Sequence, residues 1–163
     1  MKLYKFLNAD MSAIYGNGSW AFEPMPVIKG DLIPCKNGYH LCRKEDLIHW
    51  LGARLFEVEH TGEIVLSDNK VVVREAVIIS EIESWNKKNQ RLFACDCAER
   101  VLHLFESMFP DDSRARNAIE VARLYADGKA TLADLNAAGV AGVAARAAEI
   151  EWQSNRLCEY LGL

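Results

Sequence analysis

Hydrophobic residues recur with two different periods along this chain, and the change between them falls near its middle. Up to residue 82, short runs that alternate or are rich in β-branched residues predict strands. From residue 83 onward, apolar residues recur at steps of three and four, which is typical of helices that pack on one face. The pattern predicts an α+β fold, in which a mostly antiparallel sheet in residues 1–82 packs against a helical bundle in residues 83–163. One compact domain and two loosely coupled domains are both compatible with this pattern.

The first half is predicted to contain short strands joined by turns, and one short helix. Residues 71–82, VVVREAVIISEI, are β-branched and apolar almost throughout, which favours a central strand of the sheet. Residues 43–51 have a helical rhythm, and Gly52 is expected to end that helix. Further strands are expected at residues 2–7, 55–59 and 63–66 and at the end of 35–42, with turns at 29–31, 36–38, 60–62 and 67–69.

The second half is organised around a predicted helix over residues 84–108, with Ser84 as its N-cap and Pro110 as its stop. Two stripes of residues run along this helix at three- and four-residue steps. The more apolar stripe is expected to face the core and consists of Phe93, Cys97, Val101, Leu104 and Phe105. The stripe beside it is mixed and consists of Leu92, Cys95, Glu99, Leu102 and Glu106.

Two more helices are predicted after this one. The first opens at residues 110–113, whose acidic side chains suit the positive end of the helix dipole, and it ends at Gly128. The second opens at residues 131–134, where Thr131 and Asp134 resemble a capping box, and it is expected to reach about Tyr160. Glycines and many alanines in this last segment indicate close helix–helix packing, either within the fold or with a partner.

Composition narrows the function classes. The chain has 163 residues, of which 50% are hydrophobic, so it can form a real core. Its net charge is −4 and no block of like charge occurs, so no nucleic-acid partner is expected. No segment approaches the roughly 20 apolar residues that a membrane-spanning helix needs. Five scattered cysteines without a signal peptide favour a cytoplasmic protein with reduced thiols.

Several groups of residues could carry chemistry, and each has a simpler interpretation. Cys35, His40 and Cys42 are soft metal ligands, but a fourth ligand is missing nearby, so buried cysteines are favoured and no metal is predicted. Cys95 and Cys97 would point in different directions on a helix, so core packing is favoured for both.

The remaining titratable side chains form no catalytic constellation in the sequence. Glu57, Glu59 and Glu63 could act as paired acid and base, but their alternation is also typical of a solvated sheet face. His49 and His103 have no nucleophile arranged with them in the sequence.

Residues 91–126 carry a set of motifs that resembles a known family. They contain FACDCAERVL and then PDD, and the pattern AIE-x-AR-x-YA-x-GKA follows at residues 118–130, before an Ala-rich tail. In these features the chain resembles the helical domain of an immunity-protein family found in bacterial and phage genomes. The resemblance implies a protein that binds and neutralises a toxin-like partner, and it brings no active site with it.

The first half is similar to a small phage and bacterial domain of unknown function, through YKFLNADM, GYHLC and LFEVEHTGEI. Its layout is also similar to ADP-ribosyltransferase folds, in which a glycine-led segment holds the nicotinamide end of NAD and a later glutamate orients the ribose. That resemblance would give the first role to Gly38 and Tyr39, and the second to Glu63 or Glu57. The first strand lacks the Arg or His that such enzymes use, so a fold relative without activity is implied.

These observations favour a non-catalytic phage or bacterial protein that occludes a protein partner, as immunity or anti-defence inhibitors do, without a cofactor. Because interface cores favour aromatic residues, Tyr15, Trp20 and Trp152 are the predicted partner contacts. One alternative is an NAD-dependent ADP-ribosyltransferase-like enzyme, with Tyr39 and Glu63 as its catalytic residues. A further alternative is a structural homo-oligomer, whose Ala- and Gly-rich helices would pack across a symmetry axis.

Overall fold

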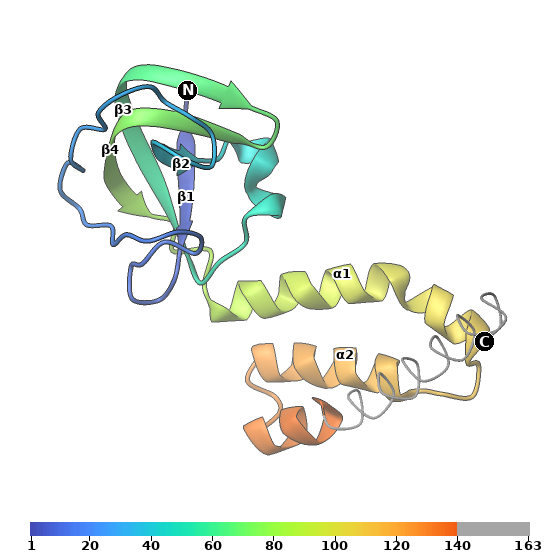
Figure 1. Cartoon of the computed structure of the whole chain (residues 1–163). Coiled ribbons are helices and arrows are strands. Elements are labelled where there is room, and N and C mark those ends of the chain that lie inside the picture. Colours follow the sequence, from blue (N-terminus) through green and yellow to red (C-terminus); the bar gives the residue numbers. More distant parts are fainter. Residues whose placement is uncertain (140–163) are drawn as a thin grey trace, which may run out of the picture. The chain divides into compact units, whose positions relative to one another are not determined.

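The computed structural model describes residues 1–139, which form parts of two compact units (Figure 1). The first, called here the N-terminal unit, is Met1–Asn86, and the helical unit begins at Lys87. A four-stranded antiparallel sheet lies in the former and helices lie in the latter, so the predicted α+β class is confirmed. That the parts before and after the predicted division between residues 82 and 83 are separate domains stays a prediction.

The sheet has the strand order β1-β3-β4-β2, with every neighbouring pair antiparallel. The strands are β1 (Leu3–Leu7), β2 (Tyr39–Leu41), β3 (Arg54–Ser67) and β4 (Lys70–Glu81). β4 is an inner strand, as its sequence predicted, and Val71, Val72 and Val73 are all 0% exposed although they alternate between its two faces. Past the end of β2, the amides of Met25 and Ile28 donate to β4 carbonyls, so the long segment between β1 and β2 covers the rest of that edge.

The predicted turn at residues 60–62 is wrong, because β3 runs through it without a break. Its register against β4 shifts between Thr61 and Ile64, and Gly62 has a φ of 76° there. A glycine inside a strand often marks such a bulge, which bends the strand without ending it. The predicted turn at residues 67–69 is confirmed, since Ser67 pairs with Lys70 across a two-residue loop.

The core of the N-terminal unit is built on this sheet, and its largest fully buried side chains include Phe56, Leu3, Leu7 and Leu41. Gly38 allows the chain to enter β2 close to β4. Its φ is 129°, and a Cβ added there would lie 2.3 Å from Val72 Cγ1. A side chain at this position would therefore strain the backbone and collide with β4.

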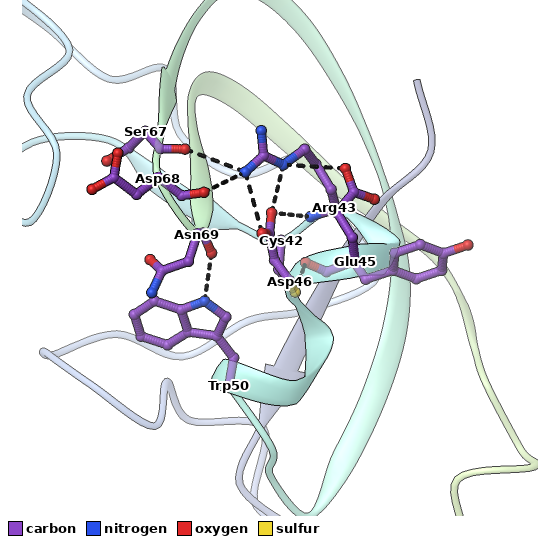
Figure 2. A network of polar contacts seen from close by, with 9 residues as sticks. Cys42, Arg43, Glu45, Asp46, Trp50, Ser67, Asp68 and Asn69 are labelled. Atoms are coloured by element: carbon purple, nitrogen blue, oxygen red, sulfur yellow. Dashed lines mark hydrogen bonds and ion pairs between the residues drawn. The ribbon is translucent and has the colours of Figure 1, made fainter.

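An ion-pair network joins the short helix η1 (Lys44–His49) to the tip of the β3–β4 hairpin. Figure 2 shows the Arg43 guanidinium between the Asp46 carboxylate and two hairpin carbonyls. Arg43 Nε donates to Asp46 Oδ2 at 2.5 Å, and Nη2 donates to the carbonyl oxygens of Asp68 at 2.7 Å and Ser67 at 3.3 Å. Asp46 is only 5% exposed, so this pair is shielded from water and holds the hairpin tip in place.

The same short helix carries a second anchor to the hairpin. At its C-cap, Trp50 Nε1 donates to Asn69 O at 2.6 Å (Figure 2). The helix predicted at residues 43–51 is thus present, in the tighter 3₁₀ form that is common in such short connectors.

The helical unit contains α1 (Lys87–Met108) and α2 (Arg114–Ala126), and residues 132–139 are also helical. The α1 helix ends before Pro110 as expected, but it begins after Asn86, so the prediction that Ser84 is its N-cap is wrong. The acidic first turn predicted for α2 is also wrong. Asp111 and Asp112 precede the helix, and Asp112 Oδ1 accepts from the Arg114 amide at 3.0 Å.

The predicted capping box at Thr131 and Asp134 is confirmed by a reciprocal pair of hydrogen bonds. The Thr131 amide donates to Asp134 Oδ2 at 2.8 Å, and the Asp134 amide donates to Thr131 Oγ1 at 3.2 Å. The rest of the helix predicted from there to about Tyr160 lies outside the described residues.

The predicted orientation of α1 is wrong, because its mixed stripe faces α2. Cys95 and Leu102 are buried, whereas Val101 and Leu104 from the stripe expected in the core are 53% and 57% exposed. Acidic residues of α1 pair with arginines of α2: Glu106 with Arg116 at 2.7 Å, and Glu99 with Arg123 at 2.6 Å. These partners explain how carboxylates can flank the packed side of the helix.

The core-packing interpretation is confirmed for Cys95 and wrong for Cys97, which is exposed. Cys97 belongs to a continuous exposed set on α1, which we call the apolar stripe: Phe93, Cys97, Val101, Leu104 and Met108.

Replacing Asp46 with alanine should lower the free energy of unfolding at pH 7, because it removes the carboxylate that holds the Arg43 guanidinium beside the hairpin carbonyls. Arg43 holds the pKa of Asp46 below its ordinary value, so this contribution is present above the ordinary pKa and is lost as the pH falls through the lower, folded-state pKa. Urea unfolding followed by circular dichroism measures both effects. Glu45→Ala is the control, since Glu45 is exposed and lies 3.6 Å from Arg43. Equal stability of the two variants would contradict this role for the network.

Candidate functional site

A cavity of about 710 Å³ lies within the N-terminal unit. Its walls come from β1, the loop at residues 13–18, the segment that leads into β2, the end of η1 and the start of β4. A more open hollow at residues 108–114 is lined by Asp112 and Arg114, which already pair with each other at 2.6 Å. The larger cavity is therefore the better candidate for a site.

The first wall contains a lysine that faces the cavity from β1. Lys5 Nζ donates to His40 O at 2.9 Å and lies 5.2 Å from the centroid of the Trp20 ring. Neither of these partners is a carboxylate. Burial lowers the pKa of Lys5 from 10.5 to about 8, since the charged ammonium loses contact with water.

The cavity contains a second lysine, which is held in a similar way. Lys70, the first residue of β4, has its Nζ 4.9 Å from the centroid of the Trp50 ring and donates to Cys35 Sγ at 3.0 Å. Tyr15 packs edge-on against Trp50, with 5.7 Å between ring centroids. Each of these two lysines is thus placed by a tryptophan ring, through a cation–π contact.

His40 lies between the two lysines and connects their surroundings. Its Nε2 accepts from the Cys35 amide at 2.7 Å. Burial, followed by the charges of Lys5 and Lys70, lowers the pKa of His40, so the imidazole is neutral at pH 7. Cys35 itself has a φ of 64°, in the left-handed region that non-glycine residues seldom adopt.

The cavity has a positive charge although the chain has a net charge of −4. Among the described residues that line it, Lys5, Lys36 and Lys70 are cationic and none is Asp or Glu. Apolar and aromatic side chains form most of the remaining wall: Phe6, Ile14, Tyr15, Trp20, Met25, Ile28, Tyr39, Leu41 and Trp50. The arrangement can hold an anion, and it offers apolar surface beside it.

Two of the three predicted partner contacts lie within the described residues, and of these only Tyr15 is exposed. Tyr15 is 71% exposed at the rim of the cavity. Trp20 is only 6% exposed and belongs to the core, where it holds Lys5. Trp152 lies outside the described residues.

The two residues named for the transferase alternative are not brought together in the cavity. Tyr39 lines it and donates from its hydroxyl to Pro26 O at 2.6 Å. Glu63 is absent from the described lining; it lies on β3, and its carboxylate pairs with Arg74. Glu57, the other glutamate considered, pairs with Lys2 at 3.0 Å.

The three soft ligands of the first half have separate partners. The Cys42 thiol is buried and donates to Tyr4 O at 3.2 Å, and burial raises its pKa to about 12. Cys35 contacts Lys70, and His40 accepts from the Cys35 backbone. Within residues 1–139, no group of three or more His, Cys, Asp or Glu side chains is placed to hold a metal ion.

The sequence-based predictions did not include Lys5 and Lys70, which give the cavity most of its positive charge. The available signal was weak: Lys5 lies in the run KLYKFL, between apolar neighbours. Lys70 follows a turn, where a lysine usually points to solvent.

Comparison with known proteins gives one match, in the C-terminal half. Residues 80–160 match the family described as "Imm-5 like putative immunity protein", and this range includes α1 and α2. No curated protein and no solved structure matches the chain significantly. The C-terminal half is therefore similar to this family of immunity proteins, whereas the ADP-ribosyltransferase resemblance of the first half finds no support. No helix within the described part of the chain is long and apolar enough to cross a membrane.

Replacing Lys5 with methionine should raise the free energy of unfolding by about 1–2 kcal/mol at pH 7, because it removes a buried cation that has no carboxylate. The pKa of Lys5 is about 8 in the folded protein and 10.5 without burial. The unfolded chain therefore binds more protons between these values, so wild-type stability should rise with pH and the difference should narrow.

Urea unfolding of both proteins at pH 7 and pH 9.5 measures this difference. Lys2→Met is the control on the same strand, since the Lys2 side chain is 71% exposed and pairs with Glu57. A Lys5→Met variant that is less stable than the Lys2→Met variant at pH 7 would contradict the description of Lys5 as an uncompensated charge.

Proposed function

We propose that this is a non-catalytic phage or bacterial protein that binds and neutralises a protein partner, as an immunity protein or an anti-defence inhibitor does. The observation that carries the proposal is the family match over residues 80–160. Neutralisation requires only that the protein cover the surface with which its partner acts, so no reactive group is needed.

The apolar stripe of α1 supports this proposal, because it supplies the kind of surface that a partner would cover. From Phe93 to Met108 it extends about 22 Å along the helix axis. Four of its side chains are between 36% and 57% exposed: Phe93, Val101, Leu104 and Met108. A helix face with apolar residues three and four positions apart is a common recognition surface for a groove or for another helix.

The opposite side of α1 is already occupied, which restricts the partner to the stripe. Leu102 and Cys95 are buried there, and Cys95 Sγ lies 3.9 Å from Ile119 O of α2. Arg123 of α2 bridges Asp96 at 2.7 Å and Glu99 at 2.6 Å. These contacts place α2 on the side of α1 that is opposite to the apolar stripe.

The double substitution Val101→Asp with Leu104→Asp should abolish partner binding, because it places two charges at the centre of the apolar stripe. The matched control is Val27→Asp with Leu66→Asp, which changes the same residue types at 58% and 60% exposure in the N-terminal unit. The wild-type protein captures its partner from a bacterial lysate, and the purified partner is then assayed for its own activity. The wild type and the control should inhibit that activity with a 1:1 stoichiometry, and the stripe variant should not.

Circular dichroism of the stripe variant shows whether its helices are retained. Inhibition by the stripe variant at wild-type concentrations would assign the contact to another surface. Captured protein whose activity is unchanged on binding would contradict neutralisation. A homodimer that dissociates only in the stripe variant, measured by light scattering, would assign the stripe to self-association.

A further inference from the structure

We propose that the cavity of the N-terminal unit binds a small organic phosphate, that is, a molecule that joins one or more phosphate groups to an apolar or planar body. This site lies on β1, β2, η1 and β4, outside the residues of the family match, and so it is separate from the proposed immunity function.

Within the described part of the chain, two lysines of the cavity have no anionic partner. Lys5 contacts a carbonyl oxygen and the Trp20 ring, and Lys70 contacts a thiol and the Trp50 ring. The Lys5 ammonium group is shielded from water, which is costly unless an anion compensates its charge, and a cation–π contact supplies only part of that compensation. The described cavity wall offers no carboxylate, so a bound anion would supply the missing charge.

The positions of the lysines favour a ligand with more than one negative charge. Lys5 donates to His40 O, and Lys70 donates to the thiol of Cys35, whose amide donates to His40 Nε2, so both lysines lie around the same part of the cavity. The imidazole stays neutral and its Nε2 is already occupied by the Cys35 amide, so the lysines are the groups left to bind an anion there. Phosphate oxygens suit lysine ammonium groups, which bind them as point charges.

The size and lining of the cavity favour an organic phosphate over a free phosphate ion. A volume of about 710 Å³ is within the range of sites for drug-sized ligands. Met25, Ile28 and Leu41 offer apolar surface beside the lysines. At the rim, the exposed Tyr15 ring next to Gly16 can cover a planar group.

Isothermal titration calorimetry on the full chain tests the proposal with four probes: ADP, glucose 6-phosphate, adenosine and inorganic phosphate. We expect ADP or glucose 6-phosphate to bind with a Kd below about 1 mM, and adenosine and inorganic phosphate to bind at least ten-fold more weakly. Tighter binding of ADP would indicate a planar body, and tighter binding of glucose 6-phosphate a sugar.

Lys5→Met and Lys70→Met should each weaken binding by at least ten-fold, whereas Lys2→Met should leave the Kd unchanged. Amide chemical shifts should move at residues 13–18 and 35–42 and not in α1. Lys5→Met is expected to be folded and more stable than the wild type, so its loss of binding would not come from unfolding.

Two results would overturn the proposal. One is the absence of binding by both ADP and glucose 6-phosphate at 5 mM, about five times the highest Kd expected here. The other is inorganic phosphate that binds as tightly as either organic phosphate, which would mean an adventitious ion only.

Discussion

The structure of the N-terminal unit depends on the shielded ion pair between Arg43 and Asp46. This pair fixes the guanidinium, which in turn holds the carbonyls of Ser67 and Asp68 at the hairpin tip. At the other end of η1, Trp50 donates a hydrogen bond to the carbonyl of Asn69. Lys70, which follows Asn69, has its ammonium group over the Trp50 ring. The ion pair at the start of this six-residue helix therefore helps to position both the hairpin tip and the Lys70 side chain in the cavity.

The two units use charge in opposite ways. In the helical unit, the arginines of α2 at positions 116 and 123 pair with carboxylates of α1, and the apolar stripe remains exposed on α1. In the N-terminal unit, Lys5 and Lys70 lie against tryptophan rings, and no carboxylate among residues 1–139 pairs with either. The first arrangement satisfies its charges internally and offers apolar surface, which suits a protein partner. The second leaves positive charge in a cavity, which suits a small anion.

The sequence predicts well where local pattern and environment agree. Residues 71–82 are apolar at almost every position because β4 is buried on both faces, and Thr131 and Asp134, three positions apart, form a capping box with each other. Prediction fails where a distant residue decides. Gly62 suggests a turn but accommodates a bulge, whose existence depends on pairing with β4. The mixed stripe of α1 contains Glu99, and only the position of Arg123 in the next helix makes that carboxylate compatible with a packed side. Lys5 looks like a surface lysine in the sequence, because its contact with the Trp20 ring depends on the fold of a distant loop.

If the apolar stripe of α1 contacts the partner, a cysteine within the stripe can report that contact. Cys97 is exposed within it, and Cys35 is an exposed cysteine of the other unit. The measurement is the rate at which N-ethylmaleimide modifies each thiol, followed by mass spectrometry of the peptides, with and without saturating partner. We expect the bound partner to slow the modification of Cys97 and to leave the modification rate of Cys35 unchanged. An unchanged rate at Cys97 in the saturated complex would contradict it.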